Sequence, residues 1–269
     1  MAIVLVVSPH PDDAVLSYGG QLAQYCDRGD RVIVYTVFAG SPGRPYSPAA
    51  ARYHGLWGQP DEPVALRLEE DRQAIRLLGA VPIYGTFLDG IYRRDENGGW
   101  LVPPGGRSRG DHLSPEPALI AEIAAAVERL IGDNDPGMVI TCSATGDHVD
   151  HARARNAVAT AAWRTATPMR FWEDIPYGIR TDYVPPLPAG IELAESEIKY
   201  VDEWAWHAKM RAVECYASQH QTLVYRGISI TEQLNAHGLA LGSDAHRGTS
   251  LGGPHYGERV WHTTFGPRR

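Results

Sequence analysis

Short apolar runs alternate with segments of helical periodicity along most of the chain. The runs at 2–7, 31–38 and 138–142 are continuous and rich in aliphatic, often β-branched residues, which is typical of strands buried on both faces. The segment 114–132 repeats its apolar residues at three- and four-residue intervals after Ser-Pro-Glu, a favourable helix start. These patterns predict an α/β fold with a mostly parallel sheet and helices on both faces. Strands are expected at about 2–7, 31–38, 81–88 and 138–142, and helices at about 17–28, 68–78, 114–132 and from about 150 onward.

Length and composition fit one globular domain. The chain has 269 residues, of which 43% are hydrophobic, enough to bury a full core. We expect a single domain over residues 1–269 with three loop-rich segments, at 39–64, 93–113 and 219–269. Because the first two follow predicted strands, we expect them to form walls of a binding site.

The charge balance and the cysteines narrow the class of partner. With 25 basic and 32 acidic residues, the net charge of −7 argues against binding nucleic acid or an anionic membrane surface. No apolar stretch approaches the roughly 18 residues of a membrane helix, and no charged segment precedes the first strand as in a signal peptide. Three cysteines without a Cys-x-x-Cys pair fit a reducing compartment. We expect a cytoplasmic protein with a small-molecule partner, and the sequence leaves a homo-oligomer open.

Two motifs rich in histidine and aspartate follow predicted strands. His-Pro-Asp-Asp occupies 10–13 and His-Val-Asp-His occupies 148–151, so both are expected where parallel strands end, the edge at which open α/β sheets bind ligands. Imidazole and carboxylate suit zinc, and a catalytic zinc typically takes three protein ligands. We expect His10, Asp13 and His151 to be these ligands. Asp12 is then free to take a proton from water bound to the metal, which predicts hydrolysis.

Each motif also has a plainer interpretation. Proline and aspartate are common in turns, so His-Pro-Asp-Asp alone is equally a turn, and the two histidines alone are equally helix-start residues. Asp150 either caps the helix or orients an imidazole from behind. Gly19 and Gly20 resemble part of a dinucleotide fingerprint, but the turn before them carries proline and aspartate where that fingerprint needs glycine.

On these motifs the chain resembles the PIG-L/LmbE family of zinc-dependent N-deacetylases. The resemblance implies a Rossmann-like sheet, zinc held by His10, Asp13 and His151, and Asp12 as general base. It further implies that His148 stabilises the oxyanion or protonates the leaving amine, so activity would need Asp12 ionised and His148 protonated. The implied reaction removes an N-acetyl or other N-acyl group from a small amine, often an amino sugar.

One departure and two substrate contacts remain open. The family usually has glutamate where this chain has Ala14, which either weakens the metal site, alters substrate choice or is compensated by another carboxylate. Arg67 and Asp89 are candidates to contact substrate, although Arg67 is equally a surface partner of Glu70. The alternatives to an N-deacetylase are another metal-dependent amidase, of the type that acts on thiol conjugates, and a non-catalytic ligand-binding member of the fold.

Overall fold

The computed structural model describes residues 1–58, 62–105, 108–110, 113–245 and 255–266. Its centre is a seven-stranded sheet of strand order β3-β2-β1-β4-β5-β7-β6, confirming the predicted mostly parallel α/β architecture. Neighbouring strands from β3 to β5 pair in parallel, and β7 is antiparallel to both β5 and β6. The strands are β1 (Ile3–Ser8), β2 (Arg31–Thr36), β3 (Val81–Tyr84), β4 (Met138–Cys142), β5 (Met169–Trp172), β6 (Ile191–Val201) and β7 (Tyr256–Phe265).

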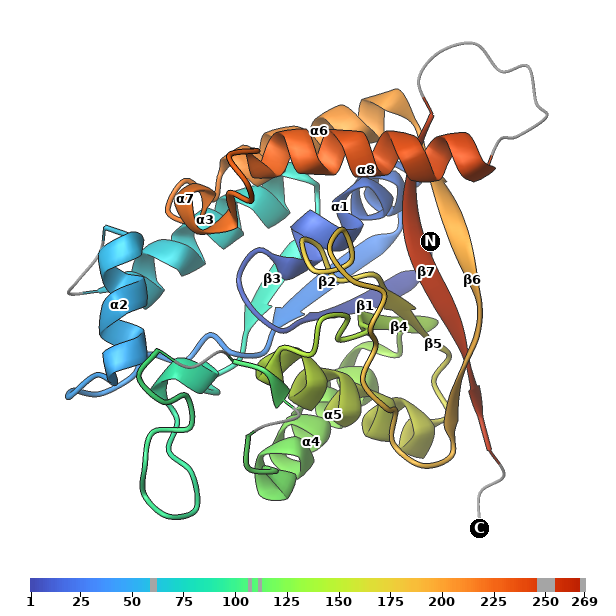
Figure 1. Ribbon diagram of the computed structural model, residues 1–269. Helices are drawn as coiled ribbons and strands as arrows, with labels where there is room; N and C mark the ends of the chain where they lie inside the picture. The colour runs from blue at the N-terminus through green and yellow to red at the C-terminus, as the bar shows by residue number, and fades with distance from the viewer. Residues whose placement is uncertain (59–61, 106–107, 111–112, 246–254, 267–269) are drawn as a thin grey trace.

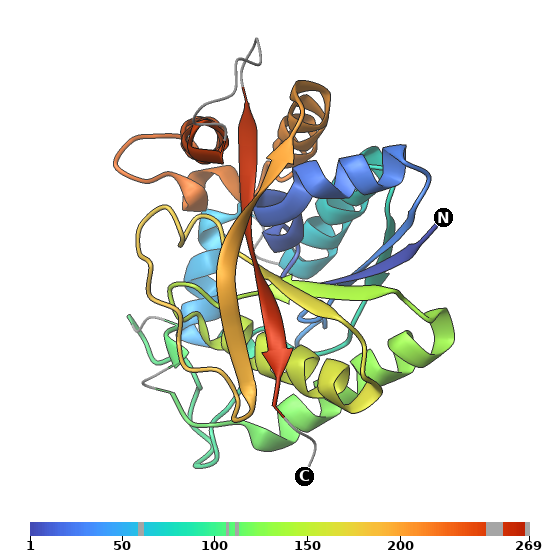
Figure 2. The same ribbon diagram turned by 90° about the vertical axis from the view of Figure 1, so that its right-hand side faces the viewer.

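Helices cover both faces of the sheet (Figures 1 and 2). In Figure 1, α1, α3, α6 and α8 lie above the sheet, and α4 and α5 pack together below it. The helices are α1 (Asp13–Asp27), α2 (Pro48–Leu56), α3 (Pro63–Leu77), α4 (Pro117–Asn134), α5 (Val149–Thr165), α6 (Glu203–Glu214), α7 (His220–Leu223) and α8 (Ile230–Ala245), with a 3₁₀ turn, η1, at Gly90–Tyr92.

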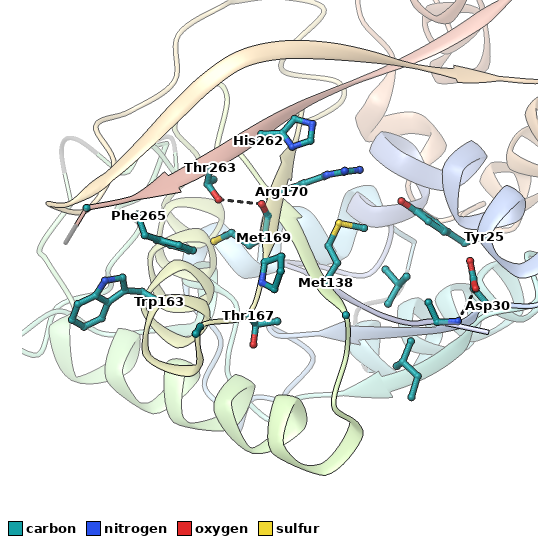
Figure 3. A pocket seen from close by; sticks show the side chains of 17 residues that line it. Tyr25, Asp30, Met138, Trp163, Thr167, Met169, Arg170, His262, Thr263 and Phe265 are labelled. Atoms are coloured by element: carbon teal, nitrogen blue, oxygen red, sulfur yellow. Dashed lines mark hydrogen bonds between the residues drawn. The ribbon is translucent and has the colours of Figure 1, made fainter. Parts of the chain in front are cut away.

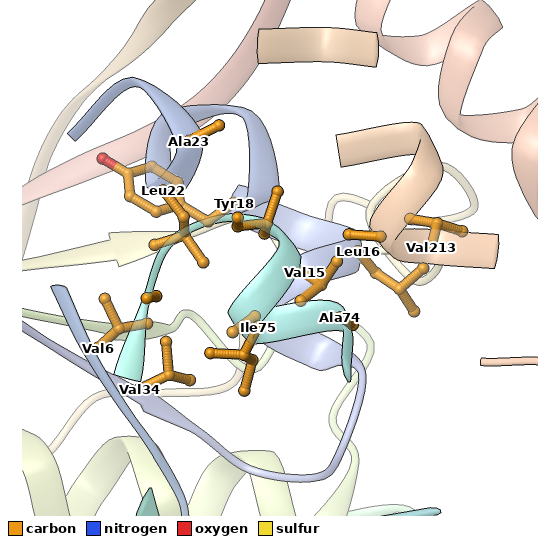
Figure 4. Close-up of a cluster of buried hydrophobic side chains, with 14 of the residues drawn as sticks. Val6, Val15, Leu16, Tyr18, Leu22, Ala23, Val34, Ala74, Ile75 and Val213 are labelled. Atoms are coloured by element: carbon orange, nitrogen blue, oxygen red, sulfur yellow. The ribbon is translucent and has the colours of Figure 1, made fainter. Parts of the chain in front are cut away.

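The alternation of side chains along the strands creates two apolar clusters. On β1, Val4 and Val6 join the cluster under α1, α3 and α6, whereas Leu5 and Val7 join the one against α4 and α5. Figure 4 shows part of the first cluster, where Val6 and Val34 of the sheet lie with Ile75 and residues of α1. Both faces of the central strands are therefore buried against apolar side chains, as expected for parallel strands with continuous apolar runs.

The glycine pair in α1 serves packing. A Cβ on Gly20 would lie 2.6 Å from Cγ1 of Val201, and one on Gly19 would lie 3.0 Å from Cγ of Lys209. The missing side chains allow α1 to approach β6 and α6 closely. The close packing of α1 against β6 and α6 explains the two glycines, so no dinucleotide site is needed to explain them.

Several predicted boundaries are wrong. The segment 219–269 contains α7, α8 and β7, and the segment 39–64 contains α2 and the start of α3. The helix expected from Ser114 begins instead at Pro117, because Glu116 precedes a proline and has a non-helical backbone (φ −125°, ψ 64°). The first helix begins at Asp13, and β3 ends at Tyr84. Within the described part of the chain, no helix is both long and apolar enough to cross a membrane.

Candidate active site

The two motifs lie side by side at the carboxyl ends of neighbouring strands. Residues 10–13 follow β1 and enter α1, and residues 148–151 follow β4 and enter α5. Since β1 and β4 pair in parallel with Val7 opposite Thr141, the loops after them leave the same edge of the sheet. The sequence-based placement of both motifs at this edge is confirmed.

One carboxylate oxygen links two imidazole rings. Oδ2 of Asp13 lies 3.1 Å from Nδ1 of His10 and 3.2 Å from Nε2 of His151. Ligand atoms of a tetrahedral zinc with bonds of about 2.0–2.1 Å are separated by about 3.3–3.4 Å. The donor types and these two distances fit a divalent metal ion such as zinc. Among the described residues, the groups whose ligand atoms all lie within 4.8 Å of one another are His10 with His148 and His151, His10 with Asp89 and Asp150, and His151 with Cys142 and Asp174.

The far nitrogen of each ring meets another carboxylate. Asp150 Oδ2 lies 2.9 Å from Nε2 of His10, and Asp174 Oδ1 lies 2.6 Å from Nδ1 of His151. Asp150 is itself fixed by Arg93, whose Nη1 is 2.7 Å from Oδ1. Carboxylates behind metal-binding imidazoles fix the ring orientation and the position of its proton, so both rings are oriented before a metal arrives.

The charges in this network balance one another. Burial by itself would lower the pKa of His151, but Asp13 and Asp174 outweigh that effect and raise it to about 9. Burial likewise opposes the charge of His10, but Asp89, Asp13 and Asp150 hold its pKa well above its usual value. Without a metal, the surroundings of His10 and His151 thus favour cationic rings. Metal binding must displace a proton from the nitrogen of each ring that would ligate the metal.

Asp12 stands in a different electrostatic environment from Asp13. Burial raises the pKa of Asp12 to about 7, and Arg67, with Nη2 3.6 Å from Oδ2, offsets only part of that effect. Asp12 also has a backbone φ of 113°, a conformation that residues other than glycine rarely adopt. The pocket therefore holds a carboxyl group whose pKa suits proton transfer near neutral pH.

The interpretation of Arg67 as a surface partner of Glu70 is wrong. Its guanidinium group is largely buried, donates from Nη2 to the Pro11 carbonyl oxygen at 2.9 Å, and lies over the Trp57 ring. Glu70 instead accepts hydrogen bonds from the backbone and hydroxyl of Ser218. Arg67 faces the loop that carries Asp12.

The surroundings of His148 favour a neutral ring in the metal-free protein, whereas the family resemblance implies a protonated one. Burial, together with His151 and His10, lowers its pKa to about 3. Its Nδ1 accepts a hydrogen bond from the backbone N–H of Asp150 at 3.3 Å, so the neutral ring carries its proton on Nε2. Such a ring can donate a hydrogen bond to an oxyanion without first being protonated.

These side chains line a pocket of about 180 Å³. Every predicted site residue lines it except Asp150, which lies behind His10. Asp89 reaches the pocket from the N-terminus of η1, where it also accepts from the Ile91 N–H at 3.0 Å. The other lining residues are mostly apolar or aromatic: Leu16, Tyr53, Trp57, Ile91, Ser108, Pro176, Tyr177, Gln219, Thr222 and Leu223.

A larger hollow of about 780 Å³ lies at the opposite ends of the strands, and Figure 3 shows it between α5, β5 and β7. Its lining includes Met138, Trp163, Met169 and Phe265, with only a few charged groups such as Arg170 at its edge. The groups of histidine, cysteine and acidic residues able to hold a metal among the described residues all include His10 or His151. The chemistry therefore belongs to the smaller pocket.

The sequence did not identify the carboxylate of Asp174 as part of the site, and it left the effect of Ala14 open. Asp174 follows β5 by two residues, and it accepts from the Ser143 hydroxyl (2.8 Å) and the Thr145 backbone (3.0 Å) as well as facing His151. Its place just after a strand was the available signal. Ala14 packs in the apolar cluster under α1, while Asp150 and Asp174 supply the carboxylates behind the rings.

The structure thus joins a mostly parallel α/β sheet to a cluster of histidine and aspartate side chains that could hold a metal ion, with the Asp12 carboxyl group beside it. Residues 5–162 match the family model described as PIG-L, GlcNAc-PI de-N-acetylase. This match covers more than half of the chain, and the protein belongs to that family.

Three relatives illustrate the range of its similarities. The chain is 32% identical over 179 residues to 1D-myo-inositol 2-acetamido-2-deoxy-alpha-D-glucopyranoside deacetylase 1 of Saccharopolyspora erythraea, a match covering 64% of this chain and 57% of that protein. The zinc-inhibited form of teicoplanin deacetylase Orf2 is 36% identical with a TM-score of 0.88, over 98% of each chain. A deacetylase–teicoplanin complex is 34% identical with a TM-score of 0.84, over 99% of this chain and 100% of the other.

Proposed function

We propose that the protein is a metal-dependent N-deacetylase that removes an N-acetyl or other N-acyl group from an amino sugar or an amino-sugar-bearing metabolite. The observation that carries the proposal is the approach of Asp13 Oδ2 to both imidazoles, with Asp12 beside them in one pocket. The relatives named above are deacetylases, one named for an acetamido sugar joined to inositol and the others for teicoplanin.

Zinc is the metal we propose, held by His10, Asp13 and His151. Bound there, zinc would supply Lewis acidity to the amide carbonyl and to the attacking water. Asp150 and Asp174 keep the ligating rings oriented. The relative described as zinc-inhibited makes the amount of zinc a variable that any assay must control.

Two side chains of the pocket have separate roles: Asp12 transfers protons, and His148 donates a hydrogen bond. Asp12, which lines the pocket beside the proposed ligands, takes a proton from the attacking water. His148, neutral and protonated on Nε2, donates a hydrogen bond to the developing oxyanion. The departing nitrogen needs a proton, and Asp12 holds one after the attack. The structure thus supports the oxyanion role for His148 more directly than that of a resting general acid.

Substrate contacts come from both sides of the pocket. We propose that Asp89 accepts from sugar hydroxyls and that Arg67 binds an oxygen-rich group, because both line the pocket. The aromatic rings of Tyr53, Trp57 and Tyr177 offer an apolar wall to an acyl or sugar face. The reducing cytoplasm remains our proposed compartment, consistent with three unpaired cysteines.

The test is amine release by purified protein from a matched panel: an N-acetylglucosamine-containing inositol conjugate, an N-acylated glycopeptide and free N-acetylglucosamine. The protein is stripped with a chelator and reloaded with zinc from zero to several equivalents, with cobalt as a parallel series. We expect release to appear at about one equivalent per chain. Metal uptake with no amine release from any compound would reject the deacetylase proposal while keeping the metal site.

A further inference from the structure

A buried arginine lies behind the proposed zinc ligand His10, one side chain further from the pocket than Asp150. Arg93 directly follows η1, and its side chain is 9% exposed. Its Nη1 forms an ion pair with Oδ1 of Asp150 at 2.7 Å, while Oδ2 of the same carboxylate lies 2.9 Å from Nε2 of His10. No hydrogen bond from another described residue reaches Asp150 Oδ1, so the guanidinium group is what balances this buried oxygen.

Arg93 is itself held in place on its far side. Its Nε and Nη2 donate to the two carboxylate oxygens of Glu116 at 2.7 and 2.8 Å, and Nη1 also donates to the Leu88 carbonyl oxygen at 2.8 Å. The guanidinium group lies over the Phe38 ring, 5.1 Å from its centroid. Paired hydrogen bonds of this kind between arginine and a carboxylate are strong and directional. The arginine therefore cannot turn away from Asp150 without breaking several of them.

The chain of contacts also decides which nitrogen of His10 is available to a metal. Nε2 faces Asp150 and donates its proton to that carboxylate, which leaves Nδ1, 3.1 Å from Oδ2 of Asp13, as the ligating nitrogen. The order Glu116, Arg93, Asp150 and His10 places an acid and a base in alternation. Each buried charge thus has an opposite charge on either side of it.

A second carboxylate lies near the same ring nitrogen. Oδ2 of Asp89 is 3.6 Å from Nε2 of His10, and Asp89 lines the pocket, where it is the proposed partner of sugar hydroxyls. Asp150 is the nearer and the better held of the two acids, because the Gly90 N–H donates to its Oδ2 at 2.8 Å and Arg93 holds its Oδ1. Fixing Asp150 therefore keeps the His10 ring in one orientation and leaves Asp89 to the substrate.

Resting on the proposed zinc site, we propose that Arg93 is a positioning residue that raises zinc affinity by holding the Asp150 carboxylate against His10. Arg93 does not line the pocket, so it acts through Asp150. Partners behind metal-binding imidazoles typically contribute about 10–100-fold to metal affinity. Loss of the arginine withdraws part of that contribution, because the carboxylate is then free to move away from the ring.

The test compares Arg93→Gln with a matched control, Arg153→Gln. Arg153 is also a buried arginine that reaches Glu116 (Nε to Oε2, 3.4 Å), but its other hydrogen bond goes to the Ser114 carbonyl oxygen at 3.0 Å. Competition with a coloured chelator measures the zinc dissociation constant of the stripped protein, and thermal unfolding measures stability. We expect Arg93→Gln to weaken zinc binding by about tenfold and Arg153→Gln to keep the wild-type affinity, although both lower the melting temperature.

A double variant shows whether the arginine acts through the carboxylate. Asp150→Asn alone should weaken zinc binding, because it removes the charge that faces His10. If Arg93 acts by holding Asp150, adding Arg93→Gln to Asp150→Asn lowers the affinity little further. Two losses that multiply in the double variant would mean that Arg93 acts by another route, and they would overturn the proposal.

Other outcomes also decide it. Wild-type zinc affinity in Arg93→Gln, or an equal loss in Arg153→Gln, overturns the proposal. Should Arg93→Gln fail to fold, Arg93→Lys takes its place: it keeps the buried charge, but one ammonium group cannot reproduce a fork that binds Glu116 and Asp150 together. Unchanged zinc affinity in Arg93→Lys would then overturn the proposal. A wild type that takes up no zinc overturns both the site and this inference, whereas one that binds zinc but releases no amine rejects only the proposed hydrolysis.

Discussion

Two adjacent aspartates divide the pocket into sides with opposite electrostatics. The metal side contains His10, Asp13 and His151 with the carboxylates behind them, and the base side contains Asp12 and Arg67. Burial penalises both charges, but His151 and His10 overcome it and hold the pKa of Asp13 far below its usual value. For Asp12, burial outweighs the ion pair with Arg67, and the charge of Asp13 opposes ionisation further, so the pKa rises to about 7. Two neighbouring residues of the same type therefore differ in pKa. Asp13 contacts two imidazole rings, whereas Asp12 has a longer ion pair with Arg67.

The largest expected effect comes from breaking the metal side. His151→Ala removes one of three ligands, so we expect zinc content to fall to background and amine release to fall by about 10³-fold. Elemental analysis and the amine assay measure the two losses. His262→Ala, a change of a half-exposed histidine on β7, should keep both. Normal zinc and normal rate in His151→Ala would remove this residue from the ligand set.

A substitution of Asp12 should lower the rate of amine release without lowering the zinc content. In Asp12→Asn the ligands are untouched, so we expect zinc to be retained while kcat falls by about 10²–10⁴-fold, the usual contribution of a general base. A kinetic assay on the best substrate of the panel, paired with elemental analysis, gives both values. Asp13→Asn serves as the comparison and should lose metal as well as rate. Retained turnover in Asp12→Asn would assign proton transfer to another group.

The carboxylates behind the rings should have intermediate effects. Asp174→Asn removes the charge that faces Nδ1 of His151, and outer partners of this kind typically change metal affinity by about 10–100-fold. Competition with a coloured chelator measures the dissociation constant. Asp182→Asn, at an exposed position in the same loop region, is the control. Equal affinity in Asp174→Asn and the wild type would show that the ring needs no partner there.

The smallest expected effect concerns stability and its dependence on pH. In metal-free protein the folded pKa of Asp12 is about 7 against 3.8 for the ordinary group, so the folded state holds the proton more tightly. This group therefore costs stability progressively as pH rises from about 4 to 7. Asp12→Asn avoids that cost, and we expect it to gain about 1–3 kcal/mol at pH 8 and nothing at pH 4. Urea unfolding in chelator at both pH values measures the difference, and a gain that is independent of pH would contradict the assigned pKa.

The central sheet and the two motifs were predictable because their signals are local. Buried parallel strands read as continuous apolar runs, and the ligands follow them within a few residues. Strand β5 was missed because it has only four residues. Strands β6 and β7 were missed because they are half-buried and polar, with residues such as Glu192 and Lys199 along β6. Arg93 was missed because an arginine beside another arginine in a loop-rich segment resembles a solvated position, and only its ion pairs with Glu116 and Asp150 show it to be buried.

The position of β7 has a consequence for how the chain is made. This strand follows every other described element along the chain, yet it lies between β5 and β6 and carries Glu258, which pairs with the buried Lys209 at 2.7 Å. Until it arrives, β5 presents an open edge and the ammonium group of Lys209 has no counter-charge. Exposed strand edges recruit other chains. A chain lacking Tyr256–Phe265 would keep every proposed site residue but expose the edge of β5, so we expect β7 to protect against aggregation rather than to take part in the chemistry.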